Sequence, residues 1–340
     1  MPLTCWIPVS HLVPETLSAA TPLVQDVDAY CCHSFCSFTV PSVRALAAAI
    51  PSGAITVGSK GKYSTLAAAL KDTSSNKYYI YAGTYTGQVA ITRSNIAIYG
   101  ESTSTGYAGN KVTLSASASA ASAGGNDQSG TVRVLASGVK LYNLNIANTY
   151  GKPVDQAQAI ALSVQAGNFG CYGCKITGAQ DTLLANIGTQ VYAQSYISGY
   201  VDFIFGQSAS IWVTNTVIAT TGSGYITASG RSSSDSNYYV FDRCTVQGSG
   251  SSYLGRPWRN YARVIFQNSS IGSNVRKEGW SVWTSSDPRT DHVTFGEYNN
   301  SGAGAWSSSR AKFATKLSSA VSISTVLGSS YSNWVDKSYL

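Results

Sequence analysis

The chain has 340 residues, of which 44% are hydrophobic and 11% charged, so it can bury a large core and lacks the composition of a long disordered protein. Glycine (32 residues), serine and tyrosine (22 residues) are abundant and glutamate and lysine are scarce, which predicts an all-β fold. The net charge of +7 favours an acidic partner, but the basic residues are scattered singly, which argues against nucleic acid and favours an anionic polysaccharide.

Residues 1–50 are predicted to be a leader or a disordered segment outside the fold. They lack a basic start followed by a continuous apolar stretch, yet residues 45–49 (ALAAA) are similar to the small-residue end of a signal peptide. Four of the seven cysteines fall here, at positions 5, 31, 32 and 36. We expect a secreted, extracellular protein with one domain at residues 51–340. No segment approaches about 18 uninterrupted apolar residues, so no membrane span is predicted.

The first part of the domain is predicted to combine short strands with one helix. Residues 63–70 (YSTLAAAL) have the spacing of an amphipathic helix, with Ser64 as its N-cap. Residues 115–130 are low in complexity and predict a loop. Strand-like runs lie at residues 54–57, 78–81, 89–91 and 96–99.

From residue 131 onward, short strand-like runs recur at intervals of 21 to 28 residues. Five of them place a small residue two positions before a branched apolar one: Cys174-x-Ile176, Ser195-x-Ile197, Thr216-x-Ile218, Cys244-x-Val246 and Ser269-x-Ile271. Unequal periods in the low twenties predict a parallel β-helix whose coils differ in loop length. A β-sandwich also has short strands, but its turns recur every ~8–12 residues without stacking like residues.

The end of the chain is predicted to pack back over the coils. Residues 310–317 (RAKFATKL) predict a short helix, and an aromatic tail follows with Tyr331, Trp334 and Tyr339.

Two local motifs allow more than one interpretation. Cys171 and Cys174 form a C-x-x-C, but no second such pair accompanies them, so small buried strand residues are a better interpretation than zinc or redox chemistry. Asn268 and Asn299 begin sequons that permit glycosylation, although such short matches are common by chance.

The scarcity of histidine limits the possible chemistry. The three histidines are His11, His33 and His292, and the first two lie in the leader. There is also no G-x-S-x-G motif, so a Ser-His-Asp triad and a catalytic zinc site are both disfavoured.

Two aspartates, Asp181 and Asp202, are separated by 21 residues, the length of the local repeat. Residues one period apart sit on adjacent coils, so both carboxylates are expected on one face and close together. An extended backbone would point Asp202 away from its apolar neighbours. Two adjacent carboxyl groups cannot both ionise without a large electrostatic cost, so the pKa of one of them rises. One group can then act as an acid while the other acts as a base or nucleophile. The competing interpretation is that they are turn residues or hydrogen-bonding strand ends.

Polar neighbours favour the catalytic interpretation. Gln180 adjoins Asp181, and Gln158 lies 22 residues earlier, one coil away. Two amide donors can stabilise an oxyanion without adding a titrating group. Arg256 is placed to hold one carboxylate ionised through a two-point contact, and Trp258 offers a flat face to a sugar ring.

These segments, taken together, resemble the pectinesterase family, and most of all its fungal members. The resemblance covers residues 53–340 and rests on five segments in the family's order: GTYTGQV (83–89), AQAIAL (157–162), GAQDTL (178–183), YVDFIFG (200–206) and LGRPW (254–258).

The resemblance implies a right-handed parallel β-helix enzyme that hydrolyses methyl esters of polygalacturonate (pectin), releasing methanol. It implies that Asp202 is the nucleophile and Asp181 the general acid and then base. Gln158 and Gln180 would form the oxyanion hole, and Arg256 would position Asp202. It also implies that Gln88, Phe205 and Trp258 contact the substrate. The implied partner is pectin, and neither nucleic acid nor a membrane. The implied enzyme is a monomer that needs no metal or organic cofactor.

The chain departs from the family pattern at Ala179, where members often carry an aromatic residue, and at Gly87, where they carry a glutamate. These departures leave the preferred methylation pattern open. Two other function classes also remain: another pectin-active β-helix enzyme, either a lyase or a polygalacturonase, and a non-catalytic carbohydrate-binding solenoid.

Overall fold

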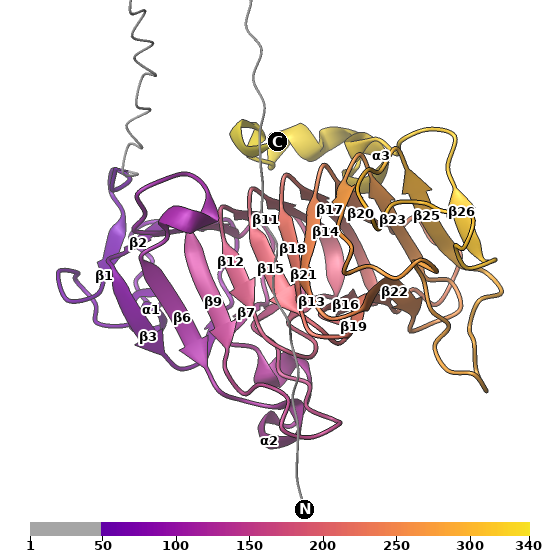
Figure 1. Ribbon diagram of the computed structural model, residues 1–340. Coiled ribbons are helices and arrows are strands. Elements are labelled where there is room, and N and C mark those ends of the chain that lie inside the picture. Colours follow the sequence, from indigo (N-terminus) through magenta and orange to yellow (C-terminus); the bar gives the residue numbers. More distant parts are fainter. Residues whose placement is uncertain (1–48) are drawn as a thin grey trace, which may run out of the picture. The chain divides into compact units, whose positions relative to one another are not determined.

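The computed structural model describes residues 49–340, and within them parallel strands wind into a β-helix (Figure 1). Strands that are neighbours along a sheet come from successive coils and pair in parallel, as β11 pairs with β14 and β14 with β17. The all-β prediction and the parallel β-helix are both confirmed. The four cysteines and two histidines before residue 49 lie outside the described residues.

Three sheets make up the described part of the β-helix. The eleven-stranded sheet contains β1 (Ile55–Val57), β2 (Lys77–Ile80), β5 (Ala97–Gly100), β8 (Lys140–Tyr142), β11 (Phe169–Tyr172), β14 (Ile187–Ala193), β17 (Ser208–Thr214), β20 (Tyr239–Asp242), β23 (Arg263–Gln267), β25 (Thr294–Tyr298) and β26 (Ala314–Lys316). The eight-stranded sheet contains β3 (Gly83–Thr86), β6 (Val112–Ala116), β9 (Leu144–Asn148), β12 (Lys175–Thr177), β15 (Tyr196–Gly199), β18 (Val217–Thr221), β21 (Thr245–Ser249) and β24 (Ser270–Ile271). The seven-stranded sheet contains β4 (Val89–Ile91), β7 (Val132–Val134), β10 (Leu162–Val164), β13 (Leu183–Ala185), β16 (Ile204–Gly206), β19 (Gly224–Ser229) and β22 (Ser252–Pro257).

The helices in this part of the chain are short. They are α1 (Leu66–Ala69), α2 (Ala120–Ala123), α3 (Ile323–Leu327) and the 3₁₀ turns η1 (Tyr107–Gly109), η2 (Asp127–Ser129), η3 (Ser329–Asn333) and η4 (Lys337–Tyr339). The segment from α3 to the C-terminus lies along the outer face of the eleven-stranded sheet (Figure 1). The predicted packing of the tail on the coils is therefore confirmed. No helix among residues 49–340 is long and apolar enough to cross a membrane.

The repeated small-x-branched pattern sets the register of the coils. Ile176 pairs with Ile197, Ile197 with Ile218, Ile218 with Val246, and Val246 with Ile271. The small residues form a second ladder, in which the backbone N–H of Cys174 donates to Ser195 Oγ at 3.0 Å. The sequence therefore predicted this stacking residue by residue.

A left-handed residue stands immediately before each of these small residues. Gly173, Gln194, Asn215, Arg243 and Asn268 have φ between 49° and 59°. This conformation lets the chain turn a tight corner from the eleven-stranded to the eight-stranded sheet, and glycine and asparagine adopt it at the lowest cost. Asn268 and Asn299 occupy this position, so corner geometry by itself accounts for asparagine at both sequons.

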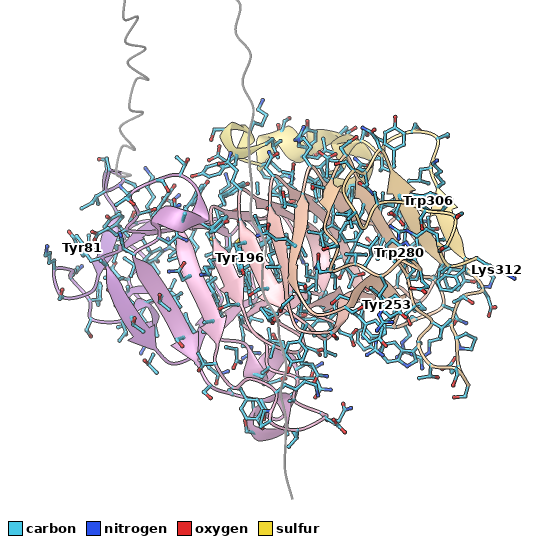
Figure 2. All side chains as sticks on the ribbon, viewed as in Figure 1. Tyr81, Tyr196, Tyr253, Trp280, Trp306 and Lys312 are labelled. Carbon is cyan, nitrogen blue, oxygen red and sulfur yellow. The ribbon has the colours of Figure 1, made fainter. Side chains whose placement is uncertain are left out.

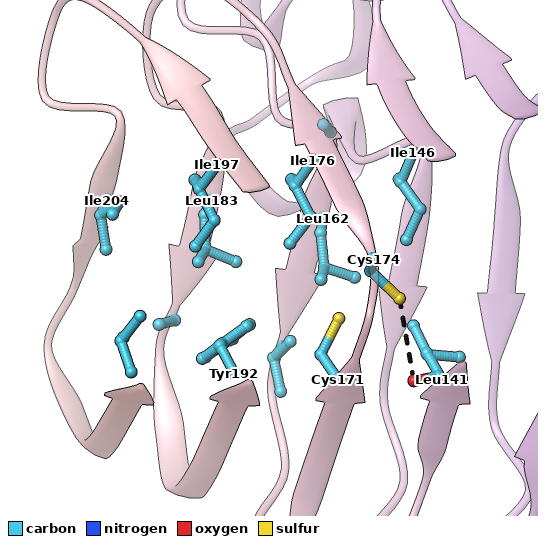
Figure 3. Close-up of a cluster of buried hydrophobic side chains, with 14 of the residues drawn as sticks. Leu141, Ile146, Leu162, Cys171, Cys174, Ile176, Leu183, Tyr192, Ile197 and Ile204 are labelled. Carbon is cyan, nitrogen blue, oxygen red and sulfur yellow. Dashed lines mark hydrogen bonds between the residues drawn. The ribbon is translucent and has the colours of Figure 1, made fainter. Parts of the chain in front are cut away.

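The core lies between the three sheets and is built from stacked like residues. Trp280 and Phe295 are buried and stack with ring centroids 4.4 Å apart. Figure 2 labels Trp280 among the C-terminal coils. Cys171 and Cys174 are unpaired and fully buried, and Cys174 Sγ lies 3.7 Å from the carbonyl oxygen of Leu141 (Figure 3). The prediction that both are small buried residues is confirmed, but only Cys171 lies in a strand, β11; Cys174 lies in the corner between β11 and β12.

Three local predictions were wrong. The helix expected at residues 63–70 is limited to Leu66–Ala69, and its N-cap is Thr65, whose hydroxyl accepts from the backbone N–H of Ala68. The loop expected at residues 115–130 contains α2, which a Ser119–Ser122 capping box starts and a left-handed Gly124 ends, and it also contains η2.

The third error concerns residues 310–317. We expected a helix, but Ala314–Lys316 forms β26 and pairs with β25. The edge of β25 offers unpaired backbone groups, and pairing with that edge outweighs the helix propensity of a short segment.

Candidate active site

The two predicted carboxylates occupy equivalent places on adjacent coils. Gln180 pairs with Val201, so the residues that follow them, Asp181 and Asp202, are also in register. Their φ angles are 62° and 48°, so Asp202 is not extended as predicted; both aspartates sit in left-handed corners just before β13 and β16. Aspartate tolerates this conformation, and both side chains line one cleft.

The cleft has a volume of about 220 Å³ and lies on the outer face of the seven-stranded sheet. Phe205, Ala228 and Arg256 form part of it and are in register on β16, β19 and β22. The residues lining the cleft are Asn126, Gln156, Gln158, Gln180, Asp181, Asp202, Phe205, Ala228, Arg256, Trp258 and Trp283. All five candidate catalytic residues are therefore brought together.

Arg256 binds Asp202 at two points. Nε donates to Oδ1 at 2.9 Å, and Nη2 donates to Oδ2 at 2.6 Å. The guanidinium also lies 4.0 Å from the ring centroid of Tyr225 and 4.3 Å from that of Trp283. The two aromatic rings and the carboxylate thus hold the guanidinium of Arg256 in place and stabilise its positive charge.

The two aspartates differ in how well their charge is compensated. Burial raises the pKa of Asp202; the hydrogen bonds and positive charge of Arg256 lower it, but the pKa stays above its usual value. Burial raises the pKa of Asp181 well above its usual value, and the negative charge of Asp202 raises it further. Asp181 makes no side-chain hydrogen bond to another described residue, in contrast to Asp202. The arrangement favours a protonated Asp181 beside an ionised Asp202.

The two glutamines are oriented by their own hydrogen bonds. Gln180 Oε1 accepts from the backbone N–H of Ala157 at 3.2 Å, which leaves its Nε2 amide available to the cleft. Gln158 Nε2 donates to Gln156 Oε1 at 2.7 Å. Both amides belong to the lining of the cleft that contains the aspartates.

The candidate substrate contacts are divided between two places. Phe205 and Trp258 line the cleft, with ring centroids 6.1 Å apart in an edge-to-face contact. Gln88 does not line it; its Nε2 donates to the carbonyls of Gln128 and Gly130, next to the segment that contributes Asn126. Gln88 therefore supports a wall of the cleft in this structure.

Several residues around the cleft were not predicted from the sequence. Asn126 comes from the segment interpreted as a featureless loop, and Trp283 from an irregular segment without a recognisable motif. Tyr225 had a detectable signal, because it stands one coil before Tyr253, and their rings stack at 5.6 Å. Among residues 49–340, no cluster of three or more His, Cys, Asp or Glu side chains is arranged to hold a metal ion.

Comparison with known proteins agrees with this architecture. The Pectinesterase family model matches residues 54–329. A pectinesterase from Aspergillus aculeatus is 44% identical over 323 residues, covering 89% of this chain and 97% of the relative. The crystal structure of the pectin methylesterase from Aspergillus niger is 42% identical, with a TM-score of 0.79 over 85% of this chain and 98% of that one. The carrot pectin methylesterase, 24% identical with a TM-score of 0.74 over 84% of this chain and 96% of its own, shares the fold. The chain therefore belongs to the pectinesterase family, a family of carboxylic ester hydrolases.

Proposed function

We propose that this cleft hydrolyses the methyl esters of polygalacturonate, with methanol and demethylated pectate as products. The observation that carries the proposal is the pair of buried aspartates one coil apart, of which only Asp202 is bound by Arg256. Family membership supports the same reaction.

In the first half of the reaction, a carboxylate oxygen of Asp202 attacks the ester carbonyl carbon. The carbonyl electron pair moves onto oxygen, and the amides of Gln158 and Gln180 donate hydrogen bonds to that oxyanion. When the tetrahedral intermediate collapses, the bond to the methoxy oxygen breaks and Asp181 gives that oxygen its proton. Methanol leaves, and an acyl-enzyme anhydride on Asp202 remains.

In the second half, Asp181 is ionised and takes a proton from water. The resulting hydroxide attacks the acyl carbon, the bond to Asp202 breaks, and Asp202 and Asp181 return to their starting protonation states. No step requires a metal or an organic cofactor. An aspartate nucleophile needs no histidine to deprotonate it, which agrees with a chain whose one described histidine, His292, stacks on Tyr261 and does not line the cleft.

The surrounding side chains supply binding. The rings of Phe205 and Trp258 form an apolar wall suited to the faces of galacturonate rings, and Trp283 extends that wall beside Arg256. Gln88 contributes by holding the segment that carries Asn126.

A product assay on methylated polygalacturonate tests the proposed activity. We expect methanol and new acid groups. New reducing ends would identify a polygalacturonase, an unsaturated product a lyase, and binding without turnover a carbohydrate-binding solenoid; each of these would contradict the proposal.

We extend the proposal to the setting in which the enzyme works. We propose a secreted, extracellular monomer made with a signal segment within residues 1–50 and carrying glycans at exposed Asn268 or Asn299. Amino-terminal sequencing of secreted material checks for removal of the signal segment, and an unprocessed chain would contradict it. Intact mass checks for glycans, and an unglycosylated mass would contradict them. Light scattering checks for a monomer, and an oligomer would contradict it.

A further inference from the structure

The outer face of the eleven-stranded sheet carries two adjacent columns of side chains at its N-terminal end. In one column, Tyr99 stacks on Tyr142 at 4.6 Å with an interplanar angle of 8°, and Tyr142 stacks on Tyr172 at 4.9 Å. In the other, Lys77 pairs with Ala97, and Ala97 with Lys140. The inward residues between these columns, such as Ile98 and Leu141, belong to the core, so both columns point outward.

The C-terminal segment covers only part of this face. Tyr339 packs on Tyr142 and Tyr172, with ring centroids 5.9 Å and 5.0 Å away. Beyond that cover, a hollow of about 300 Å³ opens between the sheet and Trp334, at the end of η3. It is a separate site from the catalytic cleft, since that cleft lies on the seven-stranded sheet.

The hollow is positively charged. Lys77 and Lys140 both line it, two strands apart, which places their backbones about 10 Å from each other with the small Ala97 between them. Neither lysine takes part in an ion pair within residues 49–340. A carboxylate close by, that of Asp336, accepts hydrogen bonds from the hydroxyls of Tyr142 and Ser338. One acid beside two lysines leaves an excess of positive charge.

The remaining lining suits a sugar better than a simple anion. Tyr99 and Trp334 present aromatic rings, and four asparagine side chains present amide donors and acceptors. Aromatic rings can stack on the faces of sugars, amides can hydrogen-bond to their hydroxyls, and lysines can pair with carboxylates. Together these groups suit a chain of uronic acids.

We propose that this hollow binds a de-esterified galacturonate segment of the polymer, the product of the catalytic cleft, as a second binding site. The choice of this ligand rests on the proposed function. A product segment held here raises the local concentration of neighbouring methylated segments at the cleft, so that long polymers gain affinity that short oligomers do not.

The first experiment maps the site directly. A de-esterified oligogalacturonate is coupled to the full chain with a carbodiimide, which joins its carboxylates to lysine amines, and the adducts are located by peptide mass mapping. We expect adducts at Lys77 and Lys140 in excess over exposed Lys60 and Lys111. Adducts spread evenly over these four lysines would overturn the proposal.

The second experiment uses matched variants. Lys77→Gln with Lys140→Gln should weaken the apparent affinity for long, partly de-esterified pectin about tenfold, whereas Lys60→Gln with Lys111→Gln, with the same loss of charge, should change it less than twofold. Trp334→Ala leaves the charge unchanged and should also weaken that affinity. Equal effects of the two lysine pairs, or no effect of Trp334→Ala, would reduce the site to general charge attraction and refute the proposal.

Methanol release from a short methylated oligomer separates this proposal from the proposed function. All these variants should release methanol from the oligomer at the wild-type rate. A wild-type chain that released none would refute the esterase while the adduct map still reported on the hollow.

Discussion

Arg256 and Asp202 are joined by two parallel hydrogen bonds across the cleft, although 54 residues separate them in the sequence. The contact opposes the effect of burial on Asp202, because burial raises the pKa of this carboxyl and Arg256 lowers it. Because β16 and β22 lie two coils apart in the same sheet, the winding of the β-helix places Arg256 next to Asp202. The fold thereby influences the reactivity of the Asp202 carboxylate.

The first prediction tests that link with Arg256→Lys. Lysine keeps a positive charge but cannot make the two-point contact, so the pKa of Asp202 should rise. Activity requires Asp202 ionised, so the acid limb of the pH profile should move to higher pH and kcat should fall about 10²-fold. A pH profile of kcat/KM checks this. Exposed Arg259 provides the matched control, Arg259→Lys, and an unchanged acid limb in Arg256→Lys would contradict the role.

The second prediction concerns Trp283, whose ring lies 4.3 Å from the guanidinium of Arg256 and 4.9 Å from that of Arg289. Arg289 in turn donates to the carbonyl of Trp258 at 2.5 Å. Trp283→Ala should remove both the stacking on Arg256 and part of the sugar wall, lowering kcat/KM about tenfold. Trp283→Phe should keep most of the activity because a ring remains. Steady-state kinetics that show equal losses in the two variants would argue against a stacking role.

The third prediction concerns the oxyanion contact of Gln180. Gln180→Ala should lower kcat about 10²–10³-fold with little change in KM, because the contact forms fully only in the transition state. Gln207→Ala alters an exposed glutamine outside the cleft lining and should leave kcat unchanged. A raised KM with a wild-type kcat in Gln180→Ala would contradict a role for Gln180 in stabilising the oxyanion.

The fourth prediction concerns stability. The pKa of Asp181 is raised in the folded state, so its contribution to stability is fully present below the unfolded pKa and is lost as the pH rises through the folded pKa. Asp181→Asn cannot ionise and escapes that loss. Its free energy of unfolding should exceed that of the wild type at neutral pH. The gap should close as the pH falls.

Denaturant titration at several pH values measures that gap. The same variant should lose activity, since its amide cannot donate and accept a proton in turn. A gap that stays constant with pH would show that Asp181 is not held protonated by burial.

Much of the fold was predictable because the β-helix repeats its local contacts. The stack of branched residues from Ile176 to Ile271 could be aligned from sequence alone, since each coil must place a branched residue over that of the preceding coil. The pairing of Asp181 with Asp202, the candidate catalytic residues, was predicted from the same spacing. The error in the backbone of Asp202 arose because period-two alternation describes strands, whereas this residue occupies a left-handed corner.

The parts that the sequence did not predict are those set by non-repeating contacts. Residues 314–316 form a strand only because β25 offers an edge, and Trp283 reaches the cleft from an irregular segment whose path depends on distant partners such as Arg256. The capping box at Ser119 and Ser122 is present in the sequence, but the surrounding serines and alanines of this low-complexity segment made it hard to recognise as the start of a helix.

Methanol release by Asp202→Asn tests the central claim most directly. The variant keeps the size of the side chain and removes the nucleophile, so turnover of methylated polygalacturonate should fall by about 10⁴-fold or more. Circular dichroism and pectin binding should stay close to those of the wild type, as should the turnover of a control variant, Asp291→Asn, at an exposed position. Methanol release at the wild-type rate from folded Asp202→Asn would contradict the account.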